Sequence, residues 1–432
     1  MPGNGHLLHF IVSIQGGKYM AVIRPFQALR PTKETASRVA ALPYDVYSRE
    51  EAREVVKDDT LTFLRIDRPE TQFPAGHDIY AEEVYDKADE MLQDMEKQGV
   101  FVQDEKACYY IYELTMDGRA QTGLVAASSV DDYMNNVIKK HENTRKDKEA
   151  DRIHHVDTCS AQTGPIFLAY RAKDEIRSLI SSIKEQEPEV AFVSEDGIVH
   201  KVWVIDTDED IQALTEAFAG MDHTYIADGH HRAASAVNVS LKRRQAKPDY
   251  TGEEEFNYFL SVLFPDDELM ILDYNRVLKD LNGLTAEEML TKIATVCNVE
   301  KAPQSPYHPT AKGEMGFLVD GCWYKLTAKP ECTVDDPVEA LDVAFLQREI
   351  LKPMWGIEDP KSDKRIDFVG GIRGLEELER RCKKDCVAAF SMFPTSIGEL
   401  FSVADADLLM PPKSTWFEPK LRSGLFIHKI ER

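Results

Sequence analysis

A run of five polar residues that could do chemistry follows directly after a short apolar segment. The segment from His223 to Ala227 is typical of a buried strand, and residues 228–232 read Asp-Gly-His-His-Arg. Gly229 permits a turn with positive φ, and the alanines that follow favour the start of a helix. A strand, a glycine turn and a helix N-terminus form an anion site, because the first backbone N–H groups of a helix lack partners within it. We call residues 228–232 the DGHHR box.

The side chains of the box add to this anion chemistry. His230, His231 and Arg232 carry N–H groups that suit a phosphate. Asp228 could hold a metal ion, orient a histidine or cap the helix. The plainer alternative is a capped helix with a surface arginine. We favour a functional site, because five such residues occur together.

A second group of candidate residues lies upstream of the box, in a charged segment that runs from Lys139 to His155. His141 and Glu142 lie beside Thr144 and Arg145 in it, so that a potential base stands close to anion ligands. Alternating charges are also typical of a solvated helix face. The sequence leaves both interpretations open.

A third group of candidate residues lies near the end of the chain, in a basic loop at residues 410–424. Three prolines stiffen this loop. It carries cations and hydroxyls that can donate to an anion, namely Lys413, Lys420, Arg422, Ser414, Thr415 and Ser423. The loop therefore suits a polyphosphate. It is equally compatible with a C-terminal tail whose Trp416 and Phe417 fill an apolar groove.

The elements that must position these groups alternate between strands and helices, which predicts a mixed α/β fold. We expect a helix over Val130 to Lys140, and we expect the aromatic segment Leu42 to Tyr47 to pack rather than to line a pocket. The predicted regions are a disordered or artefactual extension at residues 1–19, an N-terminal α/β region at 20–106, a core with the box at 107–265, and a C-terminal α+β region with the basic loop at 266–432.

Composition excludes several classes of protein. A formal net charge of −23, from 75 acidic and 52 basic side chains, would repel a polyanion, so we expect no nucleic-acid partner. The odd count of seven cysteines, spread over 432 residues, favours a reducing cytoplasm. We expect no membrane helix, because no long apolar run occurs. The chain has neither a P-loop nor a strand followed by a Gly-x-Gly-x-x-Gly turn.

The box resembles the phosphate-binding box of the ParB/sulfiredoxin-like superfamily, in which a Gly-x-x-Arg turn opens a helix and binds nucleotide phosphates. The form found here is similar to that of the free L-serine kinases of this superfamily. From Met20 onward the chain is also similar to a large bacterial and archaeal family of unknown function. That similarity rests on Arg24-Pro25, the segment 140–144, the box, and segments 272–276 and 413–420.

The resemblance implies a ParB/sulfiredoxin-like core and a kinase that transfers a phosphoryl group to the hydroxyl of free L-serine, giving O-phosphoserine. Glu142 matches the general base, with Asp228 and His231 as the other catalytic residues. Asp228 would lie near serine or a Mg²⁺ ion. The donor, ATP, ADP or pyrophosphate, stays open, and its phosphates would contact Gly229, His230, Arg232, Lys140, Thr144, Lys413, Lys420 and Arg422.

Two other functions remain possible on the sequence. One is a metal-dependent phosphoesterase, in which the box and His141, His154 or His155 bind a metal that activates water. The inserted Gly229 interrupts the Asp-His-His motif of such enzymes. The other is a non-catalytic ParB-like protein that binds nucleotide or DNA, against which the charge of −23 argues.

Overall fold

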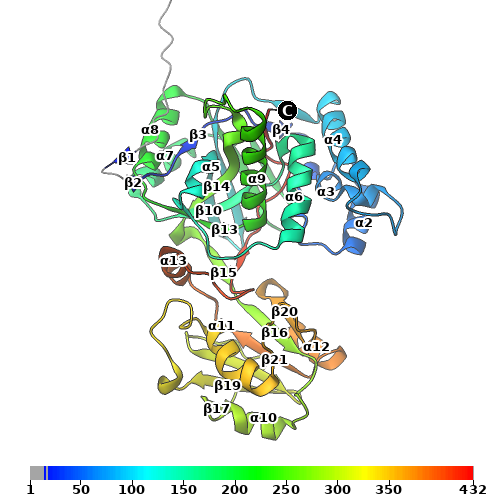
Figure 1. The fold of residues 1–432 in the computed structure, drawn as a ribbon, viewed down its shortest axis with the longest axis vertical. Helices are drawn as coiled ribbons and strands as arrows, with labels where there is room; N and C mark the ends of the chain where they lie inside the picture. Colours follow the sequence, from blue (N-terminus) through cyan, green and yellow to red (C-terminus); the bar gives the residue numbers. More distant parts are fainter. Residues whose placement is uncertain (1–13, 16–17, 432) are drawn as a thin grey trace, which may run out of the picture. The chain divides into compact units, whose positions relative to one another are not determined.

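The computed structural model describes residues 14–15 and 18–431, and the chain divides into two compact units (Figure 1). Unit 1 contains the chain up to Lys140, Thr144–Glu268 and the residues from Pro419 onward. Unit 2 contains His141–Asn143 and Leu269–Glu418. The extension predicted at residues 1–19 lies mostly outside the described residues. None of the described helices is long and apolar enough to cross a bilayer.

Unit 1 is built on a mixed, mainly antiparallel sheet in the order β11-β12-β6-β7-β14-β10-β13-β8, with β3 added beside β7. Only β10 with β14 and β13 with β8 pair in parallel. The strands are β3 (Ile23–Arg24), β6 (Tyr109–Met116), β7 (Arg119–Ser129), β8 (Ile138–Lys139), β10 (Ile166–Tyr170), β11 (Val190–Val193), β12 (Val199–Ile205), β13 (Thr224–Asp228) and β14 (Tyr258–Pro265).

Apolar faces of the helices cover this sheet and form its core. Helix α9 contributes Ala233, Ala236 and Val237 to a cluster that also holds Phe259 and Leu263 of β14. Burying each such large side chain stabilises the fold by roughly 1.5–3 kcal/mol. The helices flanking the sheet are α5 (Val130–Met134), α6 (Lys146–Cys159), α7 (Asp174–Ile183), α8 (Asp208–Ala219) and α9 (His230–Ala246).

The N-terminal region belongs to the same unit as the sheet. Its helices surround a second apolar cluster that includes Leu92 and Phe101, together with Cys159 at the end of α6 and Ile427 near the C-terminus. Helices α4, α6 and α9 lie side by side in Figure 1. The elements of this region are α1 (Ala36–Val39), α2 (Arg49–Asp58), α3 (Leu64–Asp67), α4 (Glu82–Lys97), β4 (Leu29–Pro31) and β5 (Phe101–Gln103). Later in the chain, unit 1 also contains the paired strands β9 (Ala161–Gln162) and β23 (His428–Lys429).

Unit 2 has a sheet of its own, in the order β17-β19-β18-β21-β16-β20, with neighbouring strands antiparallel. The strands are β16 (Tyr274–Leu278), β17 (Cys297–Lys301), β18 (Glu314–Val319), β19 (Cys322–Ala328), β20 (Ile366–Gly370) and β21 (Ala388–Met392), and β15 (Met270–Leu272) pairs with β22 (Trp416–Glu418). The helices are α10 (Ala286–Ile293), α11 (Asp342–Phe345), α12 (Glu376–Lys384) and α13 (Ile397–Asp405), and a π-helix spans Leu346–Trp355.

The prediction of a mixed α/β fold is confirmed. The helix expected over Val130 to Lys140 is wrong in its second half, because α5 ends at Met134. Asn136 adopts a left-handed backbone with φ 61°, which stops the helix, and the chain then pairs as β8 with β13. Pairing with the strand of the box thus overrides the local helical pattern.

Candidate functional site

The DGHHR box forms the strand, turn and helix start that its sequence predicts. Strand β13 ends at Asp228, Gly229 takes φ 92° and ψ 30°, and α9 begins at His230. An L-residue with a side chain rarely adopts this φ, so glycine suits the turn. No side chain caps α9. The backbone N–H groups of its first turn therefore offer donors to an anion.

Asp228 lies at the centre of a polar cluster that neutralises it. Its Oδ1 accepts from the backbone N–H of Gly229 at 2.8 Å, and its Oδ2 accepts from Lys420 Nζ at 2.8 Å. Burial would raise the pKa of this carboxyl, but Lys420, Arg232 and the Gly229 N–H together hold the pKa well below its usual range. Asp228 is therefore ionised and paired.

The pairing of Asp228 with Lys420 makes Asp228 a less suitable metal ligand. Both oxygens of Asp228 are engaged, so in this geometry the residue is better placed to cap the turn and pair with Lys420 than to bind a metal. Within the described part of the chain, no cluster of three or more His, Cys, Asp or Glu side chains could hold a metal ion. We derive no chemical step through a metal.

His231 is held in a defined tautomer. The backbone N–H of Arg145 donates to its Nε2 at 2.9 Å, which requires an unprotonated Nε2 and leaves the proton on Nδ1. Burial lowers the pKa of His231, and the nearby carboxylates of Asp45 and Glu149 offset this only in part. His231 is therefore a neutral imidazole that ties the box to the start of α6.

Arg232 points away from its helix toward the loop before β10. Its Nη1 donates to the carbonyl of Pro165 at 2.6 Å. Within the described residues it forms no ion pair and makes no other hydrogen bond. His230, by contrast, is buried, with 6% of its surface exposed. The charge of Arg232 also acts on Asp228, and a guanidinium that is not held in an ion pair is suited to bind an anion.

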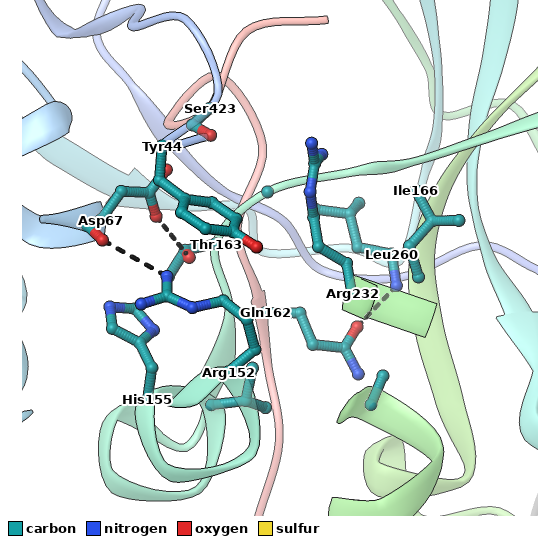
Figure 2. A pocket seen from close by; sticks show the side chains of 13 residues that line it. Tyr44, Asp67, Arg152, His155, Gln162, Thr163, Ile166, Arg232, Leu260 and Ser423 are labelled. Carbon is teal, nitrogen blue, oxygen red and sulfur yellow. Dashed lines mark hydrogen bonds between the residues drawn. The ribbon is translucent and has the colours of Figure 1, made fainter. Parts of the chain in front are cut away.

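A cavity of about 30 Å³ lies beside Arg232, entirely within unit 1 (Figure 2). The expectation that the segment Leu42 to Tyr47 only packs is wrong for Tyr44, which lines this cavity. The other lining residues come from α3, α6, α9, β14, the segment from β9 to β10 and the C-terminal segment, and they are Asp67, Arg152, His155, Val156, Gln162, Thr163, Gly164, Ile166, Ala236, Leu260 and Ser423.

Sequence reasoning missed most of this cavity, although five of its residues lie in segments that stood out. Arg232 belongs to the DGHHR box, Arg152 and His155 to the charged segment, Ser423 to the basic loop and Tyr44 to the aromatic segment. The residue types were the only feature of the sequence that could have indicated a role for these positions. Neither spacing nor charge links them, because they come from distant parts of the chain.

The remaining predicted residues divide between the two units. Lys140 Nζ lies 4.2 Å from the centroid of the Tyr133 ring, and the Thr144 hydroxyl donates to Glu149 at 2.7 Å, both in unit 1. Glu142 and Lys413 belong to unit 2. The structure thus gathers Asp228, Gly229, Arg232 and Lys420 at one place in unit 1, with His231 beside them.

Arg422 has a different role from the one predicted. It is 3% exposed, and its guanidinium is bonded to His200, Ser194 and Asp196. These contacts fix the C-terminal segment to the β11–β12 hairpin. We therefore leave Arg422 out of the phosphate contacts.

Two of the histidines of the phosphoesterase alternative already have partners. His154 stacks on Tyr85 with ring centroids 4.0 Å apart. His155 Nε2 lies 2.8 Å from the carbonyl of Ile66, so this nitrogen donates. His141 belongs to unit 2. The observed partners of His154 and His155 do not favour a metal-activated water.

Unit 1 is therefore a mixed α/β fold in which a glycine turn at a helix N-terminus offers N–H donors. The chain belongs to the DUF1015 family, described as a protein of unknown function, whose sequence pattern matches residues 23–344. No curated protein matches the sequence.

Three solved structures show distant similarity. A free serine kinase in complex with AMP is 14% identical with a TM-score of 0.36, over 72% of this chain and 91% of that chain. A conserved hypothetical protein from Pyrococcus furiosus is 14% identical with a TM-score of 0.34, over 70% and 94%. SbnI from Staphylococcus aureus, truncated at its C-terminus, is 10% identical with a TM-score of 0.35, over 69% and 85%.

Proposed function

We propose that this protein is a small-molecule kinase that transfers a phosphoryl group to the hydroxyl of free L-serine and yields O-phosphoserine. One observation carries the proposal: the left-handed turn at Gly229 presents the first N–H groups of α9 near the Arg232 guanidinium, which forms no ion pair within the described residues. Such a site suits the phosphates of a donor. Serine as the acceptor rests on the resemblance of the box to that of the free serine kinases.

The proposed roles follow the chemistry of phosphoryl transfer, which needs charge stabilisation, in-line positioning and a proton acceptor. The helix start, His230 and Arg232 bind the donor phosphates, and the Nδ1–H of His231 is a further donor. Glu142 accepts the proton of the serine hydroxyl as it attacks phosphorus. The phosphoryl group passes to that oxygen while the donor leaves with the electrons of the broken bond.

Further side chains are proposed to bind the donor. Lys140, Thr144 and Lys413 are proposed to contact its phosphates, and Lys420 holds Asp228 while it adds positive charge near the turn. The donor is a nucleotide or pyrophosphate. A Mg²⁺ ion is proposed to arrive with these phosphates, as it usually does, rather than in a cage of protein ligands.

The test is product formation from defined donors. Purified protein with Mg²⁺ and L-serine is given ATP, ADP or pyrophosphate in turn, and O-phosphoserine is measured by mass spectrometry. We expect product with at least one donor. Glu142→Gln should lower kcat by about 10²-fold or more with a small change in the KM for donor, because it removes the general base.

A matched variant separates the role of Glu142 from loss of a surface charge. Glu187→Gln removes an exposed carboxylate and should leave kcat unchanged. The proposal fails if none of the donors yields a phosphorylated product with serine or with a panel of other small hydroxyl compounds. Equal activity of Glu142→Gln and the wild type would remove Glu142 from the role of base.

A further inference from the structure

The cavity beside Arg232 has a back wall whose polar groups are already satisfied. Arg152 is bonded to Asp151 at 2.9 Å and to the carbonyl of Asp67 at 3.3 Å. The Thr163 hydroxyl donates to the Asp67 carboxylate at 3.0 Å. Gln162 accepts from the Leu260 N–H at 2.5 Å, as Figure 2 shows. These groups line the cavity, and their polar atoms are already bonded to other parts of the protein.

Three other polar groups face the same cavity without a comparable partner. Tyr44 is 9% exposed and Ser423 is 2% exposed, yet neither hydroxyl makes a hydrogen bond to any described residue. One N–H of Arg232 donates to the carbonyl of Pro165. Its other guanidinium N–H groups have no acceptor among the described residues. The two hydroxyls and the guanidinium line this cavity and keep O–H or N–H groups that can donate to an anion. Their convergence on one cavity therefore points to a ligand.

Gly164 keeps the space between these groups open. A Cβ at this position would lie 3.3 Å from Ser423 Oγ, 3.5 Å from Arg232 Cδ and 3.6 Å from Arg232 Nη1. A larger side chain would fill the cavity. Its volume of about 30 Å³ holds roughly two water-sized atoms. That is the size of a single acidic group rather than of a nucleoside.

The charge near the cavity also favours an acidic group. The one carboxylate on its wall, Asp67, is bonded to Thr163 and faces Arg152, which stays charged because Asp151 and Asp67 raise its pKa against the effect of burial. Arg232 adds a positive charge that acts on Asp228 but has no carboxylate of the described residues within ion-pair distance. The two hydroxyls can donate to the same anion.

We infer that Tyr44, Ser423 and Arg232 form one subsite for a small oxyanion, either a carboxylate or a phosphoryl group. The inference rests on the proposed function for the identity of the substrate that carries this group. An amino-acid acceptor would bring a carboxylate, and a donor would bring a phosphoryl group. The subsite links the N-terminal region, α9 and the C-terminal segment at one ligand.

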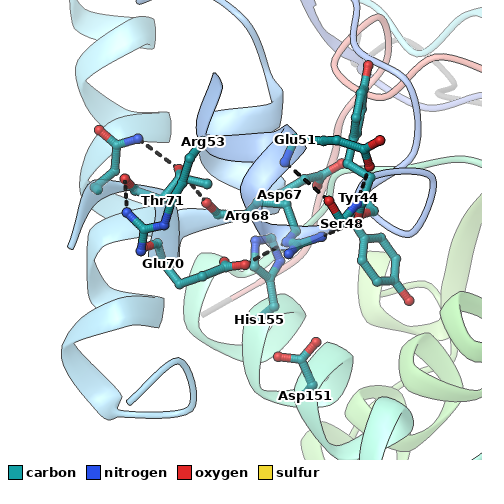
Figure 3. A network of polar contacts seen from close by, with 12 residues as sticks. Tyr44, Ser48, Glu51, Arg53, Asp67, Arg68, Glu70, Thr71, Asp151 and His155 are labelled. Carbon is teal, nitrogen blue, oxygen red and sulfur yellow. Dashed lines mark hydrogen bonds and ion pairs between the residues drawn. The ribbon is translucent and has the colours of Figure 1, made fainter. Parts of the chain in front are cut away.

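Two contacts position Tyr44 for this role. The Arg152 guanidinium lies 4.2 Å from the centroid of its ring. Its backbone carbonyl accepts from Arg68 Nη1 at 2.9 Å, and Arg68 is itself paired with Glu70 at 2.6 Å (Figure 3). Tyr44 is thus held from its ring and from its backbone, while its hydroxyl lacks a protein partner.

The test measures binding and does not depend on turnover. Calorimetric titrations with inorganic phosphate and with L-serine are run on the wild type, on Tyr44→Phe and on Ser423→Ala. Each variant removes one oxygen. We expect each variant to weaken the binding of one of the two ligands by about 10- to 150-fold, since a lost hydrogen bond to a charged group has this effect. The ligand affected identifies the source of the oxyanion.

Tyr109→Phe is the matched control. Tyr109 is fully buried and its hydroxyl lies 2.8 Å from Thr215 Oγ1, but it does not line the cavity. Its removal should leave both affinities unchanged. Circular dichroism verifies that each variant is folded.

The inference is overturned if the wild type binds neither ligand, or if folded Tyr44→Phe and Ser423→Ala bind both as tightly as the wild type does. Loss of affinity in these variants supports it even if no O-phosphoserine is formed. In that case the proposed function fails and the oxyanion subsite stands.

Discussion

At the residue scale, the two histidines of the box are not equivalent. His230 is buried, whereas His231 is only partly buried and accepts a hydrogen bond from the backbone of Arg145. A protonated His231 would lose this bond, because a doubly protonated imidazole has no acceptor. The residue therefore acts as a neutral tether and donor, and not as a fixed positive charge beside the phosphates.

A pH titration tests this assignment. Since burial lowers the pKa of His231, we expect its ring to titrate below the ordinary value of 6.5. The hydrogen bond from the Arg145 N–H should be present above the pKa that His231 has in the folded protein. It should be lost as the pH falls through that pKa. Side-chain nitrogen NMR, assigned by comparison with His231→Gln, should show the Nδ1–H tautomer at pH 7.5. A midpoint above 6.5 or an Nε2–H tautomer would contradict the assignment.

The residues of the site also show how far the sequence could predict it. The box was predicted because its five residues are contiguous and each has an evident chemistry. Lys420 was singled out only as a cation of the basic loop, since 192 residues separate it from Asp228. Tyr44 was expected to pack, because an aromatic residue in a loop is compatible with either role. Contacts between distant segments depend on the tertiary fold.

At the scale of single elements, the turn between β13 and α9 sets the orientation of the N–H groups in the first turn of the helix. Strand positions were predictable where buried, alternating or β-branched residues gave a clear pattern, as at Ile166–Tyr170 and Val199–Ile205. The end of α5 could not be predicted, because it depends on the pairing of β8 with β13. The glycine in the turn was recognisable from its type and place alone.

Gly229→Ala tests whether this turn controls anion binding. A side chain at φ 92° strains the backbone by about 1–2 kcal/mol. The added Cβ would contact Ile166 Cα at 3.7 Å and Arg232 Cζ at 3.8 Å, which are ordinary distances, so the strain comes from the backbone. We expect the turn to shift and the affinity for inorganic phosphate to fall about tenfold in calorimetric titration.

Gly197→Ala is the control for strain alone. Gly197 takes φ 79° in the hairpin between β11 and β12, with no atom within 4 Å of an added Cβ. Both variants should lower the free energy of unfolding by about 1–2 kcal/mol, but only the change at Gly229 should weaken phosphate binding. Equal phosphate affinities in the two variants would show that the turn does not position the donors.

At the scale of the whole molecule, the chain is assembled from segments that are remote in sequence. The C-terminal segment from Pro419 belongs to unit 1, where β23 pairs with β9 and Lys420 reaches the box. The N-terminal region meets the sheet through β3 and through Val22, whose N–H donates to Asp132 at 2.6 Å. Asp132 is 6% exposed, so this contact places a carboxyl group inside the unit.

This buried carboxyl makes the stability of the fold depend on pH. Burial raises the pKa of Asp132 to about 7, and the neighbouring Asp131 adds to the rise, whereas the Val22 N–H opposes it. In the unfolded chain an aspartate titrates near its ordinary value of about 3.9. Its contribution to stability is therefore fully present below about pH 4 and is lost as the pH rises through the folded pKa of about 7.

Asp132→Asn should remove this loss, because asparagine stays neutral and its side-chain oxygen can still accept from Val22. We expect the variant to be more stable than the wild type at pH 8 by an amount on the order of 4 kcal/mol. The gain should shrink toward pH 4 and level off above pH 7, as measured by urea denaturation across this range. Asp86→Asn, which removes an exposed carboxylate from α4, should change stability little at either pH. A gain that is the same at pH 4 and pH 8 would show that ionisation of Asp132 is not its cause.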